Sequence, residues 1–442
     1  MRIAVVGLGK LGAPLAAVMA SKGHDVLGID INPTAVKLLN DGHAPVEEPG
    51  LQALVSASRE RLRATTDVAA AAECDVTIVL VPTPSDERGA FTNRFVLAAF
   101  DDLGRGLAGR DEYHLVVVAS TVMPGSCEAE LAPALERASG RRIGDTLGLC
   151  YSPEFIALGN VIRDMLEPDM VLIGESDTRA GAVLEHISRG VCENDPPYRR
   201  MSLVNAELTK IAVNTYVTMK ISYANALADM CERLPGADVE VVTDALGLDT
   251  RIGRKYLRGA IAYGGPCFPR DNKAFAVLAR DLGAEPFLAE ATDAVNVAQT
   301  ARLARVVRSR LKSGDTVGIL GLAYKPDTGL IEESPGVALA RVLGEAGFVV
   351  HIYDPIALAA AARELEAIAQ PAASVAELLE ASDVVVIATP WPEFADLPLD
   401  AMRRNGRRTV VIDCWRLLSD EAYAGTIDIV RLGQALAESS RV

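Results

Sequence analysis

The chain opens with the segment Arg2-Ile-Ala-Val-Val-Gly-Leu-Gly-Lys-Leu-Gly12, an apolar run that ends in a Gly-x-Gly-x-x-Gly turn. A helical pattern continues from this turn to about Ala20. A second apolar run follows, Gly23-His-Asp-Val-Leu-Gly-Ile-Asp30, and it ends in a carboxylate. A strand, a glycine turn, a helix and an acidic residue about 20 positions further on are typical of an α/β domain that binds a dinucleotide. The alternative is a glycine-rich turn without a ligand.

Each residue of this turn has a physical role in the predicted site. Gly7 makes the tight turn, Gly9 lets the backbone approach a pyrophosphate, and Gly12 permits close packing of the helix. Asp30 is placed to bind ribose hydroxyls, and its charge favours NAD over NADP because it would repel a 2′-phosphate. The predicted cofactor site at this turn comprises Gly7, Gly9, Lys10, Leu11, Gly12 and Asp30.

Composition limits the possible partners. A length of 442 residues predicts two to three domains, and a net charge of −15 disfavours nucleic acid and anionic membranes. The seven cysteines are dispersed without a Cys-x-x-Cys pair, which indicates a reducing compartment and neither disulfides nor a metal site. No apolar run reaches membrane-spanning length, and glycines interrupt the apolar start. We therefore expect a cytoplasmic protein with no metal, no nucleic-acid partner and no membrane association.

Polar residues follow three further apolar runs, residues 74–81, 114–120 and 147–151. Thr83, Thr121 and Glu154 stand just after these runs. In open parallel sheets the ligand lies beyond the carboxyl ends of the strands, so these residues are candidates for the same site. For each residue taken singly, a helix cap or a solvated turn residue is the alternative, and the coincidence of three such residues at three strand ends favours a functional site.

The pattern of apolar runs separated by glycines and prolines changes at about residue 202. Residues 205–232 contain no Gly or Pro and have helical periodicity, which predicts a long helix between two domains and a possible dimer interface. Lys210 and Asn214 are four residues apart and share one face of that helix. A surface position for Lys210 is the alternative.

The last third repeats the opening plan with apolar runs at 315–321, 347–354, 382–390 and 407–413. It lacks the Gly-x-Gly-x-x-Gly turn and carries Gly321-Leu-Ala-Tyr-Lys-Pro326 in its place. The sequence therefore predicts two α/β domains around a helical centre, with Lys325 indicating a phosphate-bearing ligand in the second.

A single cysteine lies in the segment Tyr263-Gly-Gly-Pro-Cys-Phe-Pro-Arg-Asp271. Cys267 is expected on a turn just before a helix that begins near Arg270 or Asp271. A thiol beside a helix N-terminus has a lowered pKa and can act as a nucleophile. A buried structural cysteine is the alternative.

Taken in order along essentially the whole chain, these motifs resemble the UDP-glucose/GDP-mannose dehydrogenase family. The segments that carry the resemblance are 7–12, 81–84, 120–122, 153–155, the helix with Lys210 and Asn214, 263–271 and 321–326. The resemblance implies two Rossmann-like parallel-sheet domains joined by a long central helix. We expect an NAD-binding domain at 1–200, a central helical dimerisation domain with the cysteine loop at 201–300, and a UDP-sugar-binding domain at 301–442.

The resemblance also implies an activity, the oxidation of a nucleotide-sugar C6 alcohol to a carboxylate by two successive NAD molecules. Cys267 would capture the intermediate aldehyde as a thiohemiacetal and then hold a thioester. Lys210 and Asn214 would stabilise the oxyanion, while Asp271, Thr121 and Glu154 would serve water and proton transfer. The substrate residues implied by position are Glu154, Lys210, Asn214, Arg251, Tyr256, Arg258, Gly264, Lys325 and Arg416, and the cofactor site would include Thr83, Thr121 and Glu154.

Two positions depart from the family pattern. Leu158 stands where many members have a substrate-contacting acid, and Glu332 stands where an arginine contributes to the cofactor site. The first expectation is a UDP-hexose, in particular UDP-glucose; a UDP-N-acetylhexosamine or GDP-mannose remains open. A two-electron dehydrogenase of the 6-phosphogluconate type is the alternative from another class, and a silent NAD-binding scaffold is a third. A homodimer is expected.

Overall fold

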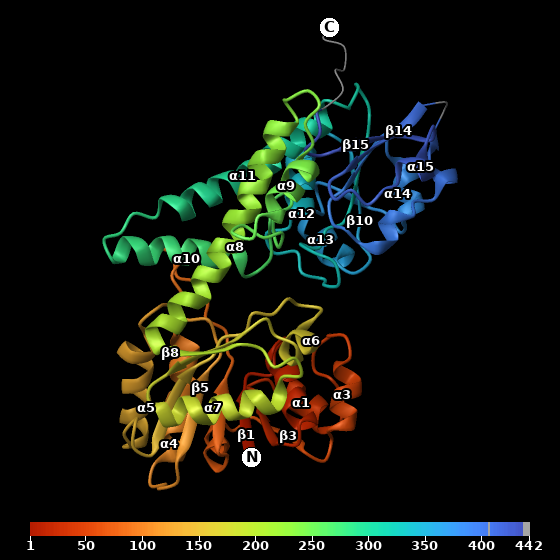
Figure 1. The fold of residues 1–442 in the computed structure, drawn as a ribbon. Coiled ribbons are helices and arrows are strands. Elements are labelled where there is room, and N and C mark those ends of the chain that lie inside the picture. Colours follow the sequence, from red (N-terminus) through yellow and green to blue (C-terminus); the bar gives the residue numbers. More distant parts are fainter. Residues whose placement is uncertain (405–406, 436–442) are drawn as a thin grey trace. The chain divides into compact units, whose positions relative to one another are not determined.

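The structure, a computed structural model, describes residues 1–404 and 407–435. It divides into two compact units, Met1–Val213 and Asn214–Val442, which are described separately (Figure 1). Among the described residues, no helix has both the length and the apolar character needed to cross a bilayer.

The first unit is built on an eight-stranded sheet with the order β3-β2-β1-β4-β5-β6-β7-β8. All neighbouring strands are parallel except β6 and β7, which pair antiparallel. The strands are β1 (Arg2–Val6), β2 (Asp25–Ile29), β3 (Leu62–Thr65), β4 (Val76–Val79), β5 (His114–Val118), β6 (Leu147–Tyr151), β7 (Val171–Glu175) and β8 (Tyr198–Ser202).

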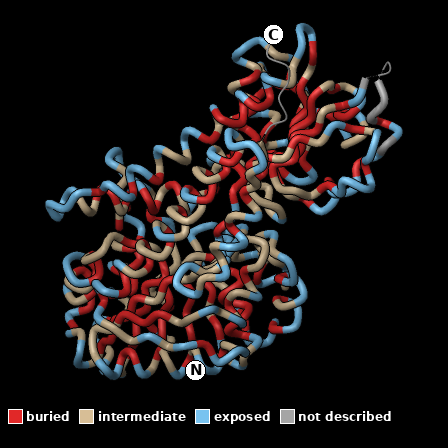
Figure 2. The backbone as a smooth tube through the Cα atoms, turned by 45° about the horizontal axis from the view of Figure 1, so that its top comes forward, coloured by how far each residue is buried: buried red, intermediate tan, exposed pale blue. Residues whose placement is uncertain are grey.

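Helices connect these strands because parallel neighbours need a crossover rather than a hairpin. They are α1 (Gly12–Ser21), α2 (Pro33–Asn40), α3 (Leu51–Ala57), η1 (Val68–Glu73), α4 (Arg94–Leu107), η2 (Cys127–Leu131), α5 (Ala132–Ser139), α6 (Val161–Leu166) and α7 (Thr178–Val191). Strands β4, β5 and β6 are buried along their whole length. Figure 2 shows the buried residues in red, concentrated in the interior.

A single helix, α8 (Leu203–Cys231), runs for 29 residues and crosses the boundary between the two units. It begins and ends within two residues of the range expected from the sequence. Because no Gly or Pro interrupts it, the helix has no internal breaking point.

The second unit contains a seven-stranded sheet with the order β11-β10-β9-β12-β14-β13, in which β15 also pairs with β14. Its strands are β9 (Val317–Leu320), β10 (Val350–Tyr353), β11 (Gln370–Pro371), β12 (Val384–Ile387), β13 (Arg403–Arg404), β14 (Arg407–Asp413) and β15 (Ile427–Arg431). Its helices are α9 (Val239–Leu248), α10 (Phe268–Asp281), α11 (Phe287–Arg308), α12 (Pro335–Glu345), α13 (Leu358–Glu364), α14 (Val375–Ala381), η3 (Pro392–Ala395), η4 (Leu399–Met402) and α15 (Asp420–Tyr423).

The second sheet repeats the glycine packing of the first with a longer loop. A Cβ on Gly12 would lie 1.8 Å from the carbonyl oxygen of Gly7, and one on Gly336 would lie 2.2 Å from that of Gly321. In both units, therefore, the helix packs tightly on the turn after the first central strand. The second instance has no compact glycine motif in the sequence, because 14 residues separate Gly321 from Gly336. The predicted fold class, two Rossmann-like sheets with a long central helix, is confirmed.

Candidate active site

The turn between β1 and α1 depends on two glycines. Gly7 has φ +100°, and a Cβ there would lie 2.1 Å from the carbonyl oxygen of Leu80; Gly12 packs against Gly7 itself. At Gly9, in contrast, a Cβ would meet nothing within 4 Å. Packing therefore does not require glycine at this position, and the open space beside it at the start of a helix fits the pyrophosphate of NAD.

Asp30 lies beside this turn at the end of β2. Its carboxylate accepts hydrogen bonds from the backbone N–H of Leu8 at 2.6 Å and of Asn32 at 2.8 Å, and the residue stays partly exposed. The corresponding Asp354 of the second unit is 1% exposed and accepts five hydrogen bonds, one of them from the Trp391 indole. Asp30 thus retains acceptor capacity for ribose hydroxyls, whereas the carboxylate oxygens of Asp354 accept hydrogen bonds from within the fold.

The loops after β4 and β5 are joined to each other. The Thr83 hydroxyl donates to the carbonyl oxygen of Thr121 at 2.6 Å. The Ser120 hydroxyl accepts from the N–H of Val81 at 2.9 Å and donates to its carbonyl oxygen at 2.7 Å. The structure therefore brings Thr83 and Thr121 together at the carboxyl ends of adjacent strands, where the sequence placed them.

Lys210 holds the loop after β6. Its ammonium group donates to the carbonyl oxygen of Glu154 at 2.6 Å and lies 4.6 Å from the centroid of the Phe155 ring. The side chain is buried, so the surface alternative for Lys210 is wrong. Burial raises the pKa of the Glu154 carboxyl to about 7, although the Lys210 charge acts in the opposite direction. A carboxyl with this pKa is suited to general base catalysis near neutral pH.

Cys267 differs from the other six cysteines, all of which lie in the described residues. It is exposed at the N-cap position of α10, whereas the others are buried or half-buried. Burial raises the pKa of each of those other thiols. Helix α10 begins at Phe268, slightly before the predicted start, because Pro269 fits a first turn whose N–H groups have no helical partner. The prediction of a turn cysteine before a helix is confirmed.

One helical turn after Cys267, Asp271 is 1% exposed. Its carboxylate accepts a hydrogen bond of 2.6 Å from the side-chain amide of Asn214, and its N–H donates to the carbonyl oxygen of Cys267 at 2.8 Å. The Arg270 guanidinium lies 3.8 Å from the same carboxylate. Three of the predicted catalytic residues, Cys267, Asp271 and Asn214, are thus connected within the second unit.

The glycines before Cys267 allow two backbones to approach closely. A Cβ on Gly264 would lie 2.1 Å from the carbonyl oxygen of Glu333, and Gly265 has φ +87° with the Tyr324 ring against it. The N–H of Gly265 donates to the carbonyl oxygen of Glu332 at 2.9 Å. The exposed Glu332, which departs from the family pattern, therefore holds the cysteine loop through its backbone. Lys325 is half-buried in the same loop after β9.

The three arginines predicted to contact substrate pair with carboxylates in this structure. Arg251 pairs with Asp249 at 2.6 Å and is largely exposed. Arg416 donates to both oxygens of Asp238, at 3.0 and 2.7 Å. Any anion that binds these guanidinium groups has to exchange with, or add to, the internal carboxylates.

Arg258 and Tyr256 flank the cysteine loop. Arg258 donates to Glu240 at 3.2 Å and to the carbonyl oxygen of Trp415. Tyr256 is 52% exposed, and its ring packs edge-on to Phe268, the residue after Cys267, with centroids 6.3 Å apart. Tyr256 is therefore accessible beside the start of α10, and Arg258 is exposed on the segment between α9 and α10.

Known proteins match the chain along most of its length. Residues 1–191, 204–298 and 318–420 match the NAD binding, central and UDP binding domains of the UDP-glucose/GDP-mannose dehydrogenase family. The chain belongs to this family. It is 39% identical over 420 residues to the UDP-glucose 6-dehydrogenase AglM of Haloferax volcanii, covering 93% of this chain and 97% of that protein.

Two further relatives differ in their named substrates. The GDP-mannose 6-dehydrogenase of Pseudomonas aeruginosa is 34% identical over 80% of this chain and 81% of its own length. The structure of a UDP-glucose dehydrogenase from Pyrobaculum islandicum has a TM-score of 0.88 at 34% identity and covers 98% of each chain. The chain is thus an NAD-dependent nucleotide-sugar dehydrogenase, as the sequence motifs indicated.

The structure of this dehydrogenase contains a residue that the sequence analysis did not single out. Glu207 on α8 is fully buried, and its carboxylate accepts from the N–H of Gly125 at 2.6 Å and of Cys127 at 2.8 Å. It thereby ties the loop that carries Thr121 to the helix that carries Lys210. The available signal was its spacing of three residues from Lys210, which places both side chains on one face of the helix.

Proposed function

We propose that this dehydrogenase oxidises the C6 alcohol of a UDP-hexose, with UDP-glucose as the first substrate to test, to the uronic acid. The accessible thiol of Cys267 at the start of α10, next to the Asn214–Asp271 pair, is the observation that carries the proposal. A two-electron dehydrogenase has no use for such a thiol. A UDP-N-acetylhexosamine or GDP-mannose remains the alternative substrate, because Leu158 departs from the family pattern.

The proposed mechanism requires two oxidations with a covalent intermediate between them. The Gly7–Gly12 turn and Asp30 would hold NAD, which would supply the hydride acceptor for each oxidation. After the first, the Cys267 thiolate adds to the aldehyde carbon, and the carbonyl electrons move to oxygen, which takes up a proton to give a thiohemiacetal. Loss of a hydride and a proton then leaves a thioester on Cys267.

Water releases the product. We assign Lys210 and Asn214 to stabilising the oxyanion in each step, since both are preorganised hydrogen-bond donors. Glu154, whose pKa is about 7, is proposed to remove a proton from the attacking water. Asp271 and Thr121 are proposed to position that water and relay protons. Hydrolysis regenerates the thiol and yields the carboxylate, so that each substrate consumes two NAD and one water.

For the nucleotide-sugar we propose a set of residues that supply positive charge, an aromatic ring or close backbone approach. Guanidinium groups suit a diphosphate because they pair with its oxygens through two parallel hydrogen bonds. The proposed set outside the catalytic residues is Arg251, Tyr256, Arg258, Gly264, Lys325 and Arg416.

We further propose a cytoplasmic homodimer in which Arg251 completes the partner's substrate site. Exposed apolar side chains on α8 and α9 support the homodimer, because large exposed apolar patches on a protein surface mark interaction sites. Those with more than half of their surface exposed are Tyr216, Tyr223, Met230, Val241 and Leu248. We retain 1–200, 201–300 and 301–442 as the proposed functional division.

The deciding experiment incubates the purified protein with NAD and, separately, UDP-glucose, UDP-N-acetylhexosamines and GDP-mannose. We expect NADH formation with a UDP-hexose at two NADH per substrate consumed, and a uronic acid product by mass spectrometry. The Cys267→Ala variant should lose net acid formation. A ratio of one NADH per substrate in the wild-type protein would establish the two-electron alternative.

A further inference from the structure

The segment that leads to Cys267 has buried backbone without secondary structure. Residues 257–266, between α9 and α10, form neither helix nor strand. Ala260, Ile261 and Tyr263 within it are 2%, 3% and 8% exposed. Buried N–H and C=O groups without partners are costly, so side chains have to supply the missing hydrogen bonds.

Two asparagines supply them. The Asn225 side chain on α8 accepts from the N–H of Ala260 at 2.8 Å and donates to the carbonyl oxygen of Ile261 at 2.8 Å. The Asn296 side chain on α11 accepts from the N–H of Tyr263 at 2.8 Å and donates to the carbonyl oxygen of the same residue at 3.0 Å. Each amide presents one donor and one acceptor, as a neighbouring β-strand would. We call Asn225 and Asn296 the asparagine clamp.

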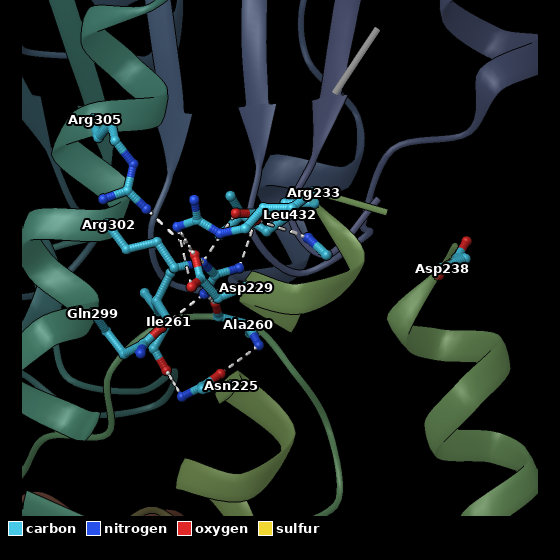
Figure 3. A network of polar contacts seen from close by, with 12 residues as sticks. Asn225, Asp229, Arg233, Asp238, Ala260, Ile261, Gln299, Arg302, Arg305 and Leu432 are labelled. Carbon is cyan, nitrogen blue, oxygen red and sulfur yellow. Dashed lines mark hydrogen bonds and ion pairs between the residues drawn. The ribbon is translucent and has the colours of Figure 1, made fainter. Parts of the chain in front are cut away.

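A buried ion pair between Arg302 on α11 and Glu232, the residue after α8, supports the clamp, and Figure 3 shows Arg302 beside Asn225 and Ala260. Arg302 donates to both carboxylate oxygens of Glu232, at 3.1 and 2.5 Å, and these two side chains are 5% and 4% exposed. Its remaining nitrogen donates to the carbonyl oxygen of Ala260 at 3.2 Å and to Gln299 at 2.7 Å. The carbonyl oxygen of Ala260, which Asn225 does not contact, therefore also has a hydrogen-bond donor. These bonds leave the clamped segment little freedom to shift.

We propose that Asn225 and Asn296 are positioning residues that set the place of the Cys267 thiol for attack on the aldehyde. The clamp acts on residues four to seven positions before the cysteine, and the Gly265 N–H bond to Glu332 restrains the remainder. This inference rests on the proposed function. The step it governs is formation of the bond between Cys267 Sγ and the aldehyde carbon, whereas the first hydride transfer does not involve the thiol. A displacement of about 1 Å is enough to slow such a reaction by about 100-fold.

The test uses Asn296→Asp, which keeps size and the acceptor but turns a carboxylate oxygen toward the Tyr263 carbonyl oxygen. We expect alkylation of Cys267 by iodoacetamide to slow by about tenfold, because the thiol leaves its place at the helix N-terminus. With substrate and NAD, the first NADH should form at the wild-type rate and the second about 100-fold more slowly. Asn225→Asp should act in the same direction, and a thermal melt establishes that each variant is folded.

The matched control is Asn205→Asp, the same substitution at an exposed position of α8, which should leave both rates unchanged. A folded Asn296→Asp variant with the wild-type alkylation rate and unchanged timing of both NADH molecules would overturn the inference. If the wild-type protein releases only one NADH, the proposed function fails, and the alkylation rates still decide whether the clamp positions the thiol. If Asn225→Asp does not fold, Asn296→Asp alone decides.

Discussion

The side-chain amide of Asn214 donates a hydrogen bond of 2.6 Å to the carboxylate of Asp271, one helical turn beyond Cys267. The pair is buried, with Asn214 and Asp271 9% and 1% exposed. A bond from a neutral donor to a charged acceptor is strong when both are shielded from water. The carboxylate thus fixes the orientation of the Asn214 amide, which is the group that we propose to stabilise the oxyanion.

Asp271→Asn is expected to lower kcat by about 100-fold, within the range for loss of a group in proton transfer. The new amide cannot bind a proton and presents an NH₂ group that can face the Asn214 donor. KM for the nucleotide-sugar should change by only a few-fold, because nucleotide binding is assigned to other residues, Arg251, Arg258 and Arg416. Steady-state kinetics give both constants, and mass spectrometry of the quenched protein should detect the accumulated thioester.

The control for this substitution is Asp101→Asn, at an exposed position of α4. It should behave as the wild-type protein in both kinetic constants. Wild-type kcat in a folded Asp271→Asn variant would remove this carboxylate from the mechanism.

Two glycines of the first turn are expected to respond differently to alanine. Gly12→Ala places a Cβ 1.8 Å from a backbone carbonyl oxygen and should destabilise the first unit, lowering Tm. Gly9→Ala places a Cβ in open space, so Tm should stay within a degree or two while the Kd for NAD rises by about tenfold or more. Thermal melts and titration calorimetry with NAD separate the two effects. Wild-type affinity for NAD in Gly9→Ala would contradict the assignment of this space to the pyrophosphate.

The rate of product formation should depend on the protonation of Glu154. Burial raises the pKa of this carboxyl to about 7, and a general base works only when deprotonated. The rate should therefore rise with pH up to about 7 and level off above it. In Glu154→Gln the rate should be low, and its pH profile should not rise between low pH and pH 7. A wild-type profile that is flat between pH 5.5 and 8.5 would exclude Glu154 as the rate-determining base.

Local signals in the sequence predicted the glycine turn, the shared face of Lys210 and Asn214, and the strands β1, β2, β4, β5, β6, β9, β10, β12 and β14. They did not predict the remaining strands, β3, β7, β8, β11, β13 and β15. Each signal depends on a few neighbouring residues: apolar periodicity, glycine spacing, or a four-residue helical repeat. The predicted helix start near Arg270 or Asp271 is two to three residues late, because Pro269 lies in the first turn of α10 and not in the preceding loop.

Long-range partners were beyond the reach of such signals. Glu207 binds backbone groups 80 and 82 residues away, and Arg416 pairs with Asp238 across 178 residues. Neither distance leaves a periodic pattern in the chain, since only the fold brings these groups together. The asparagine clamp likewise depends on where α8 and α11 meet an irregular segment.

His114 should make the stability of the first unit sensitive to acid. The ring is 2% exposed, with Nδ1 3.0 Å from the carbonyl oxygen of Cys74 and Nε2 2.9 Å from the Thr77 hydroxyl. The carbonyl can only accept, so Nδ1 carries the proton and Nε2 accepts from Thr77. Burial lowers the pKa of this imidazole from 6.5 to about 4.

Between these two pKa values the unfolded chain binds a proton at His114 and the folded chain does not. The contribution of the buried neutral ring is therefore fully present above pH 6.5. It is lost as pH falls toward 4, by about 3 kcal/mol of unfolding free energy in total. Urea denaturation at pH 7.5, 5.5 and 4.5 should give a smaller loss for His114→Gln than for the wild-type protein. The exposed control His43→Gln should follow the wild type. If the free energy of unfolding falls with pH by the same amount in His114→Gln and wild type, His114 titrates normally in the folded chain.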